Sequence, residues 1–308
     1  MIFNPKTVAF GRHETFPLRY SWLTKGFQAL LNDPKIFESP DATVTLGVGK
    51  NMVNAIRFWL QAAQVVEKTP KGLFITPVGE AIFNEENGGY DPYLEDEATL
   101  WLLHWLLATN PSQATAWYWF FNQFHKPEFT SQEASTALLD FAKQNITAKF
   151  SAGTVKQDAT ILLRMYVRSK GNTRTPLEEA LDSPFSLLGL VAQAPGGKSF
   201  QSRPGARDGL PLGVLGFAVT QLMQLMGSQQ LPIEDLMYSK TTYPAPGAVF
   251  RLTESALLTK LEQLIHVLPG TYEMRETAGI HQLYLLEDIK PLAYLERHYH
   301  TDERGVAA

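Results

Sequence analysis

Residues 50–76 read KNMVNAIRFWLQAAQVVEKTPKGLFIT, and this stretch decides the predicted fold. Apolar residues recur at helical spacing over 50–65, which predicts an amphipathic helix. Two short apolar runs then flank Thr69-Pro70-Lys71-Gly72, a turn signal, and predict a two-stranded hairpin. Upstream, residues 16–31 predict a helix with Pro17 in its first turn, and residues 42–46 a short element. Helix, turn, helix and hairpin follow one another in the order of a winged helix-turn-helix.

The polar face of the predicted helix has the chemistry of a DNA-recognition helix. Such a helix is apolar on one side and carries cationic and amide groups on the other, and it enters a major groove about 12 Å wide. Hairpin lysines would reach adjacent phosphates. The predicted contacts are Lys50, Asn51, Asn54 and Arg57 on the helix, with Lys68 and Lys71 on the hairpin. The alternative is a winged helix that serves only a structural or protein-docking role.

Two very aromatic helices are predicted over 98–109 and 114–124. Their rings lie on both helix faces, which predicts burial on several sides. We therefore expect the rings to form a core. A surface that stacks single-stranded or flipped bases is the alternative. The rings are those of Trp101, Trp105, Trp117, Tyr118, Trp119, Phe120, Phe121 and Phe124.

The rest of the chain repeats the helix-turn-helix pattern. Thr130-Ser131-Gln132-Glu133 is a capping box that opens a helix to residue 144, and residues 151–166 resemble a second DNA-reading helix. Further DNA contacts are predicted at Lys156 and Arg164, and at Arg203 and Arg207 in a Gly/Pro-rich loop. Residues 250–285 form a third helix-then-hairpin pattern around Ala278-Gly279, whose acidic balance favours a protein partner.

The predicted fold class is mainly α with small β wings: tandem winged helix-turn-helix modules around an aromatic helical core. Three domains are expected. Residues 1–85 form the DNA-binding winged helix, and residues 86–228 form the aromatic core with the second helix-turn-helix and the basic loop. Residues 229–308 form a C-terminal winged-helix-like domain.

Composition limits the function classes. The net charge of −4 hides alternating blocks: +3 over 1–82, −7 over 83–133, +4 over 134–215 and −4 over the remainder. A local basic face suffices for phosphate contact, because salt screens charges beyond about 10 Å. The absence of cysteine excludes disulfides, thiol nucleophiles and Cys-ligated zinc. No apolar run reaches the roughly 20 residues of a membrane span, so we expect a cytoplasmic protein without membrane contact.

One segment near the N-terminus concentrates groups that phosphodiester chemistry uses. Arg12, His13, Glu14 and Arg19 are the candidate catalytic residues. The arginines would bind the phosphate, and the imidazole or carboxylate would position a water. The alternative is that Glu14 and Thr15 cap a helix while His13 packs. Asp91, Glu95 and Asp96 could supply oxygen ligands to Mg²⁺ or Mn²⁺, although such a cluster is also typical of a solvated acidic loop.

Several long motifs occur in the order found in one family. They are GRHETFPLRYSWL at 11–23, VTLGVGKNMV at 44–53, DPYLED at 91–96, WLLHW at 101–105 and WYWFFN at 117–122. The chain thereby resembles an uncharacterised-domain family associated with bacterial DNA phosphorothioation, the SspB-like component. The resemblance is close over about residues 10–170 and looser beyond.

The resemblance implies a DNA-nicking partner in a sulfur-modification and phage-defence system. Its implied protein partners are a cysteine desulfurase, an ATPase and a protein similar to PAPS reductases. Two functions therefore stay open: a metal-dependent nickase that exposes one strand for sulfur insertion, and a non-catalytic adaptor that binds DNA and recruits the modification complex. No nuclease signature in the sequence separates them.

Overall fold

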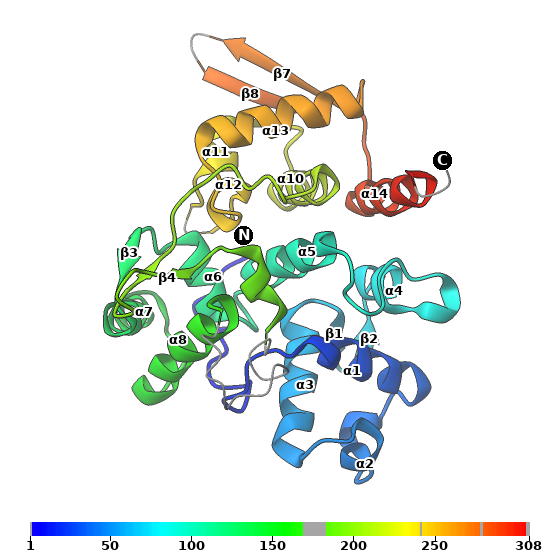
Figure 1. Ribbon diagram of the computed structural model, residues 1–308, viewed down its shortest axis with the longest axis vertical. Coiled ribbons are helices and arrows are strands. Elements are labelled where there is room, and N and C mark those ends of the chain that lie inside the picture. The colour runs from blue at the N-terminus through cyan, green and yellow to red at the C-terminus, as the bar shows by residue number, and fades with distance from the viewer. Residues whose placement is uncertain (1, 169–182, 241, 278–279, 306–308) are drawn as a thin grey trace. The chain divides into compact units, whose positions relative to one another are not determined.

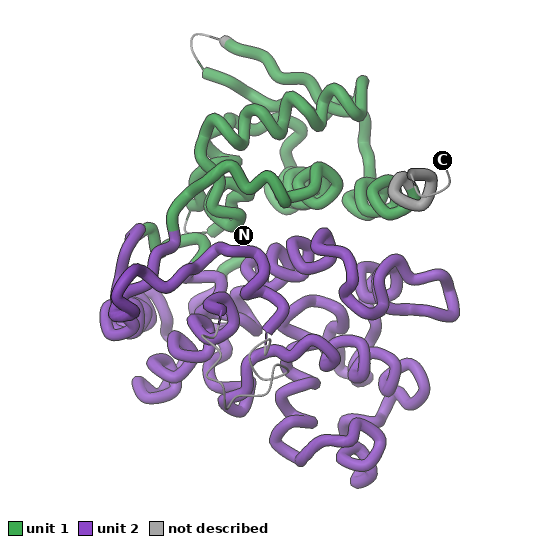
Figure 2. Tube along the Cα trace, viewed as in Figure 1, with its two compact units in different colours: residues 1–3, 121–125, 203–308 green, residues 4–120, 126–202 purple. Residues whose placement is uncertain are grey.

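The computed structural model describes residues 2–168, 183–240, 242–277 and 280–305. The chain divides into two compact units (Figure 2). The larger unit comprises residues 4–120 and 126–202, and the smaller comprises residues 1–3, 121–125 and 203–308. The three-domain division expected from the sequence stays a prediction. Among the described helices, none is both long and apolar enough to cross a membrane.

The larger unit begins with helices and a hairpin in the predicted order (Figure 1). These elements are α1 (Tyr20–Asn32), a 3₁₀ turn (Ile36–Glu38), α2 (Ala42–Leu46), α3 (Lys50–Ala62), β1 (Val66–Thr69) and β2 (Gly72–Ile75). Thr69 pairs with Gly72, so Pro70 and Lys71 alone form the hairpin turn. Helix α1 packs on α3 through its apolar stripe. The sequence predictions for α2, α3 and the hairpin are confirmed, except that α3 ends at Ala62 rather than at residue 65.

The start of the first helix was predicted wrongly. It begins at Tyr20 rather than at residue 16, and Arg19 takes the N-cap position with an extended backbone. Gly11, Glu14 and Thr15 all have positive φ, so the preceding segment is a loop. Glu14 and Thr15 therefore do not cap this helix.

The remainder of the larger unit is helical, with one small sheet. Its elements are α4 (Pro77–Phe83), a 3₁₀ turn (Glu85–Asn87), α5 (Glu97–Ala108), α6 (Thr115–Asn122, shared with the smaller unit), β3 (Glu128–Phe129), α7 (Ser131–Asn145), α8 (Ala152–Tyr166), a 3₁₀ segment (Pro184–Leu188), β4 (Ala192–Gln193) and β5 (Phe200–Gln201). The sheet is antiparallel in the order β3-β5-β4. Thr130 and Glu133 form the predicted capping box of α7. Helices α7 and α8 pack together.

The aromatic helices are core. Every residue of α5 from Ala98 to Ala108 is buried. The eight aromatic rings that the sequence assigns to these two helices are each no more than 9% exposed. The core interpretation is therefore confirmed, because rings so enclosed cannot stack on a nucleic acid.

The smaller unit contains a second antiparallel sheet covered by helices. Its elements are α10 (Leu212–Met226), β6 (Gln230–Pro232), α11 (Ile233–Met237), α12 (Pro246–Val249), α13 (Glu254–Val267), β7 (Tyr272–Thr277), β8 (Ile280–Leu285) and α14 (Pro291–Gly305). The strand order is β6-β8-β7, so the predicted hairpin gains a third strand. The predicted turn at 278–279 lies outside the described residues. The fold is thus mainly α with small antiparallel sheets.

Candidate nucleic-acid interface

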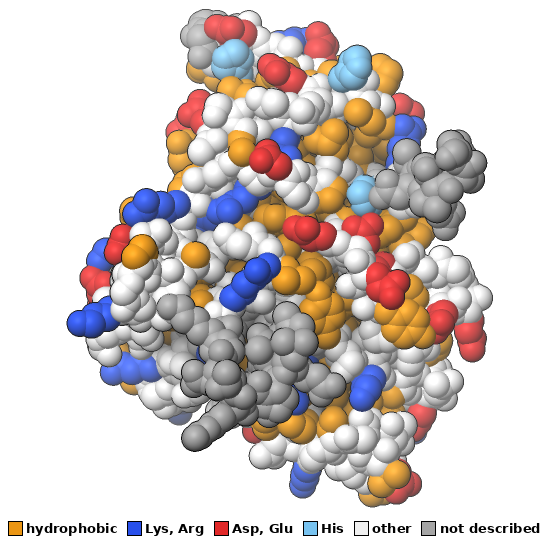
Figure 3. All heavy atoms as spheres, in the orientation of Figure 1, with side chains coloured by type: hydrophobic (Ala, Val, Ile, Leu, Met, Phe, Trp, Pro, Cys, Tyr) orange, Lys and Arg blue, Asp and Glu red, His pale blue; other side chains and the backbone are white. Residues whose placement is uncertain are grey.

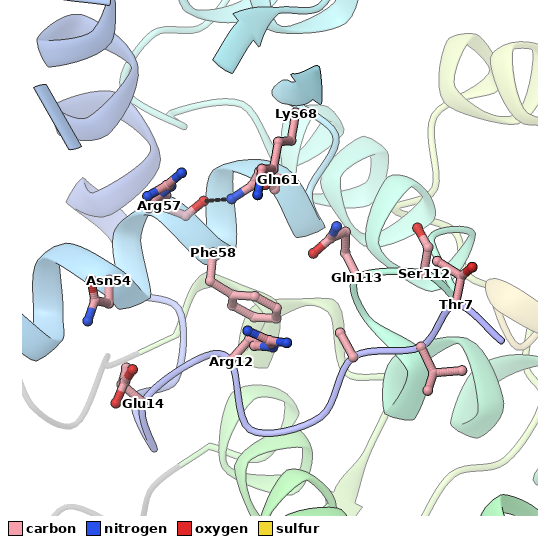
Figure 4. A pocket seen from close by; sticks show the side chains of 12 residues that line it. Thr7, Arg12, Glu14, Asn54, Arg57, Phe58, Gln61, Lys68, Ser112 and Gln113 are labelled. Atoms are coloured by element: carbon pink, nitrogen blue, oxygen red, sulfur yellow. Dashed lines mark hydrogen bonds between the residues drawn. The ribbon is translucent and has the colours of Figure 1, made fainter. Parts of the chain in front are cut away.

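A hollow of about 540 Å³ in the larger unit is lined by residues from three parts of the sequence, 7–14, 54–68 and 112–113 (Figure 4). The N-terminal segment contributes Arg12 and Glu14, helix α3 contributes Asn54 and Arg57, and β1 contributes Lys68. Each of these residues was predicted from the sequence to contact DNA or to act on it, but in separate groups. The hollow therefore places candidate catalytic and candidate DNA-binding residues around one space.

Helix α3 supplies one wall because its polar face points away from the core. Asn54 is exposed and Arg57 half-buried, whereas Val53, Ile56 and Trp59 are buried on the opposite side. Phe58 and Gln61 also line the hollow. The Gln61 side chain donates from Nε2 to the Arg57 carbonyl at 2.9 Å, which fixes its orientation. Figure 4 shows these side chains on one side and Arg12 and Glu14 on the other.

The loop that carries Arg12 and Glu14 is held in an unusual backbone conformation. Gly11, Glu14 and Thr15 have φ values of 71°, 51° and 67°. Left-handed backbone costs free energy at residues other than glycine and persists only where surrounding contacts impose it. Gly11 could not be replaced cheaply, because an added Cβ would collide with the Thr154 side chain on α8. The positive φ values therefore indicate that contacts with the rest of the larger unit impose the conformation of this loop.

A buried histidine and aspartate hold that loop. His13 Nε2 lies 3.0 Å from Asp158 Oδ1, and the Gly11 N–H donates to the same Oδ1 at 2.8 Å. The Thr15 N–H donates to His13 Nδ1 at 3.1 Å, so Nε2 carries the proton and donates to Asp158. Burial raises the pKa of the Asp158 carboxyl, and the bonds from His13 and Gly11 oppose that rise.

His13 does not touch the hollow. Its ring is 0% exposed, stacks on Trp59 and meets Phe58 and Trp117 edge-on. A fully enclosed ring cannot contact a substrate in this arrangement, so the packing alternative accounts for His13. Its neighbours Arg12 and Glu14 are exposed and line the hollow. His13 and Asp158 are therefore positioning residues for the loop.

We expect Asp158→Ala to lower the free energy of unfolding by roughly 1–3 kcal/mol, because the buried His13 and the partly buried Gly11 N–H lose their acceptor. Asp158→Asn should lose much less, since both donors meet the same oxygen, which the amide retains. Urea denaturation measures both. Asp140→Ala, an exposed aspartate on α7, is the matched control. Equal losses in the Ala and Asn variants would contradict the shared-acceptor account.

The other predicted DNA contacts lie outside the hollow's lining. Lys50 and Asn51 are exposed at the start of α3, and Lys71 is exposed at the hairpin turn. Lys156 and Arg164 are exposed on α8. On the face drawn in Figure 3, basic and acidic side chains are interspersed.

Three further predicted arginines make contacts within the protein. Arg19 lies over the Trp22 ring, at 5.4 Å from its centroid. Arg203 and Arg207 belong to the smaller unit, where Arg207 donates to the carbonyls of Arg203 and Arg251. Burial lowers the pKa of the Arg207 guanidinium. None of the three lines the hollow.

The predicted metal ligands do not form an open ligand set. Asp91 is 6% exposed, and its carboxylate accepts from the backbone of Glu95 and Asp96 and from the Thr99 hydroxyl at 2.5 Å. Asp96 caps α5 by accepting from the Ala98 N–H. Among the described residues, no group of three or more acidic or histidine side chains could hold a metal ion. Asp91 and Asp96 organise the start of α5, the Glu95 side chain is exposed, and the three carboxylates do not fit a metal.

The site residues predicted from the sequence did not include Phe58, Gln61 or Gln113 of the hollow's lining, nor Asp158, which holds the loop that carries Arg12 and Glu14. Gln113, from the segment just before α6, faces α3 across the hollow, and Gln61 lines it from α3. Asp158 lies 145 residues from the histidine it binds. Gln61 could have been found, because it lies on the predicted polar face one turn after Arg57. Nothing local marks Gln113 or Asp158, since only the tertiary fold brings them here.

The profile of a family described as "Protein of unknown function (DUF4007)" matches residues 10–299. This chain belongs to the DUF4007 family. Two solved structures are similar to this DUF4007 protein over most of both chains. One is described as "SspB crystal structure": it is 27% identical, has a TM-score of 0.83, and the match covers 96% of this chain and 90% of that one.

The other similar structure is described as "Magnesium ion-bound SspB crystal structure". It is 26% identical with a TM-score of 0.81, over 95% of this chain and 88% of that one. No curated protein matches the chain. The resemblance to an SspB-like, uncharacterised family that the sequence motifs indicated is confirmed.

Proposed function

We propose that this DUF4007 protein is the DNA-binding component of a bacterial DNA phosphorothioation system. One observation carries the proposal: candidate DNA-contacting residues from the N-terminal loop, α3 and the hairpin line one hollow. The similarity to SspB structures supports the assignment to a phosphorothioation system. The motif resemblance supplies the proposed partners: a cysteine desulfurase, an ATPase and a PAPS-reductase-like protein.

The proposed mode of binding is that of a winged helix. Helices α1–α3 and the β1–β2 hairpin are interpreted as that module, with the exposed face of α3 toward the major groove and Lys68 and Lys71 toward flanking phosphates. The hollow beside α3 carries the cationic side chains Arg12, Arg57 and Lys68 against one carboxylate, Glu14. Such a lining attracts a backbone phosphate, and its two guanidiniums can each bind the phosphate through paired hydrogen bonds.

The binding proposal is tested by its salt dependence. Lys50→Ala with Arg57→Ala should weaken duplex binding and reduce the magnitude of the slope of log K against log salt by about 0.9 for each phosphate that the variant no longer neutralises. Fluorescence anisotropy at several salt concentrations measures this. Lys143→Ala, an exposed lysine on α7, is the control and should change neither quantity. A folded double variant with unchanged affinity and slope would exclude this face of α3.

Strand nicking is a second candidate, favoured by the presence of Glu14 in the same hollow as the arginines. Hydrolysis would add a water oxygen to phosphorus and break one phosphorus–sugar oxygen bond. Glu14 would take the proton of the attacking water, the leaving sugar oxygen would take a proton from solvent, and Arg12 and Arg57 would stabilise the charge on the phosphoryl oxygens. A magnesium ion is present in one similar SspB structure. Because Asp91 accepts hydrogen bonds on both carboxylate oxygens and Asp96 caps α5, no step of this reaction is assigned to a metal held by these two residues.

A further inference from the structure

The hollow is larger than one phosphate requires, and its lining contains more kinds of side chain than phosphate binding needs. Its volume of about 540 Å³ falls within the range of roughly 300–1,000 Å³ that is usual for small-molecule sites. Three cations account for phosphate binding, but carboxamides and an aromatic ring line the same space. These additional groups are Asn54, Gln61, Gln113 and Phe58.

The carboxamides have the chemistry that reads a base. Each can donate and accept, and asparagine and glutamine pair with the edges of bases in this way. Gln61 already donates one amide hydrogen to the Arg57 carbonyl at 2.9 Å, which leaves its second N–H and its amide oxygen for a ligand. Gln113 faces α3 from the opposite wall, so the two amides approach the space from different sides (Figure 4).

The floor of the hollow is apolar and rigid. Phe58 lines it but is only 6% exposed, and its ring packs against Trp59 at 4.8 Å between centroids and against His13. The ring is therefore a fixed apolar part of the wall and, like the equally enclosed rings of α5 and α6, offers a base no face to stack on.

We propose that the hollow holds one whole nucleotide of the bound DNA, with its base outside the helical stack. Arg12, Arg57 and Lys68 bind its phosphate, and Gln61 and Gln113 bind the edge of its base. The inference rests on the proposed DNA-binding function and adds to it the ligand class of this site. The free energy of unstacking is smallest for single-stranded or mismatched DNA, so the site favours those substrates.

Mononucleotides test the inference with the intact protein. The probes are the four deoxynucleoside 5′-monophosphates, the matching nucleosides and inorganic phosphate, with binding followed by saturation-transfer NMR. At least one monophosphate should bind more tightly than both its nucleoside and phosphate. Gln113→Leu should weaken that monophosphate about threefold to tenfold and leave phosphate binding unchanged. The control is Gln132→Leu, at an exposed glutamine on α7, which should change neither.

Duplex affinity, measured in parallel by anisotropy, separates the two proposals. A protein that binds duplex DNA but binds all monophosphates no better than phosphate has a phosphate site only, which overturns the nucleotide inference and leaves the proposed function standing. Unchanged nucleotide binding in folded Gln113→Leu overturns the inference as well. A protein that binds no DNA overturns both.

Discussion

Glu14→Gln should lower the rate of strand nicking by about a hundredfold or more, the contribution typical of a general base. Duplex affinity should stay within about twofold, because the group acts mainly in the transition state. The amide keeps the size of the side chain but cannot take a proton from water. Glu14 lies at φ 51° and is exposed, so its side chain does not support the core. Conversion of supercoiled plasmid to open circle, in Mg²⁺ and in Mn²⁺, gives the rate.

The matched control is Glu38→Gln, an exposed glutamate outside the hollow, which should nick at the normal rate. Normal nicking by Glu14→Gln would remove Glu14 from the chemistry. A wild-type protein that binds DNA but nicks it with neither metal would favour the non-catalytic adaptor, and the hollow would then serve binding alone.

Trp105→Ala should lower the free energy of unfolding by about 3–5 kcal/mol, the usual cost of removing a buried tryptophan. Trp105 is 0% exposed on a helix whose whole length from Ala98 to Ala108 is buried. Urea denaturation measures the loss. Phe74→Ala, which removes a 45% exposed ring on β2, should cost far less. A Trp105 variant with normal stability and no affinity for single strands would revive the base-stacking interpretation.

Elements with strong local signals could be predicted from the sequence. Helix α3 has a clear apolar stripe, and the hairpin has Pro70 and Lys71 at a two-residue turn. Thr130 and Glu133 form the capping box that starts α7. In each case the residues that determine the element lie within it or at its end. Local reasoning is sufficient there.

The start of α1 could not be predicted in this way. Pro17 is compatible with a first helical turn, but His13 and Asp158 hold the preceding loop in place, and that contact joins residues 145 apart. The same contact buries His13 in the middle of the candidate catalytic segment. Arg12 and Glu14 are exposed on either side of a buried His13, so neighbours in sequence have different roles. Periodicity does not reveal this, because the loop is neither helix nor strand.

The candidate site was predicted in pieces rather than as a whole. The sequence pointed to Arg12 with Glu14, to Asn54 with Arg57, and to Lys68, each from its own local pattern. The fold brings these pieces together and adds Gln113 from the segment before α6. Conversely, Asp91 belongs to a sequence pattern typical of metal ligands, but its carboxylate oxygens accept hydrogen bonds from backbone N–H groups and a hydroxyl.

Site-specific cross-linking tests most directly whether DNA occupies the hollow. The chain has no cysteine, so one introduced thiol is labelled uniquely with a photo-activated cross-linker. Gln113→Cys places the label in the hollow, and Gln132→Cys places it on α7 as the matched control. With both labelled proteins folded and bound to duplex DNA, illumination should cross-link DNA to the label at 113 and not to the label at 132. Cross-linking only at 132, or equally at both positions, would contradict the account.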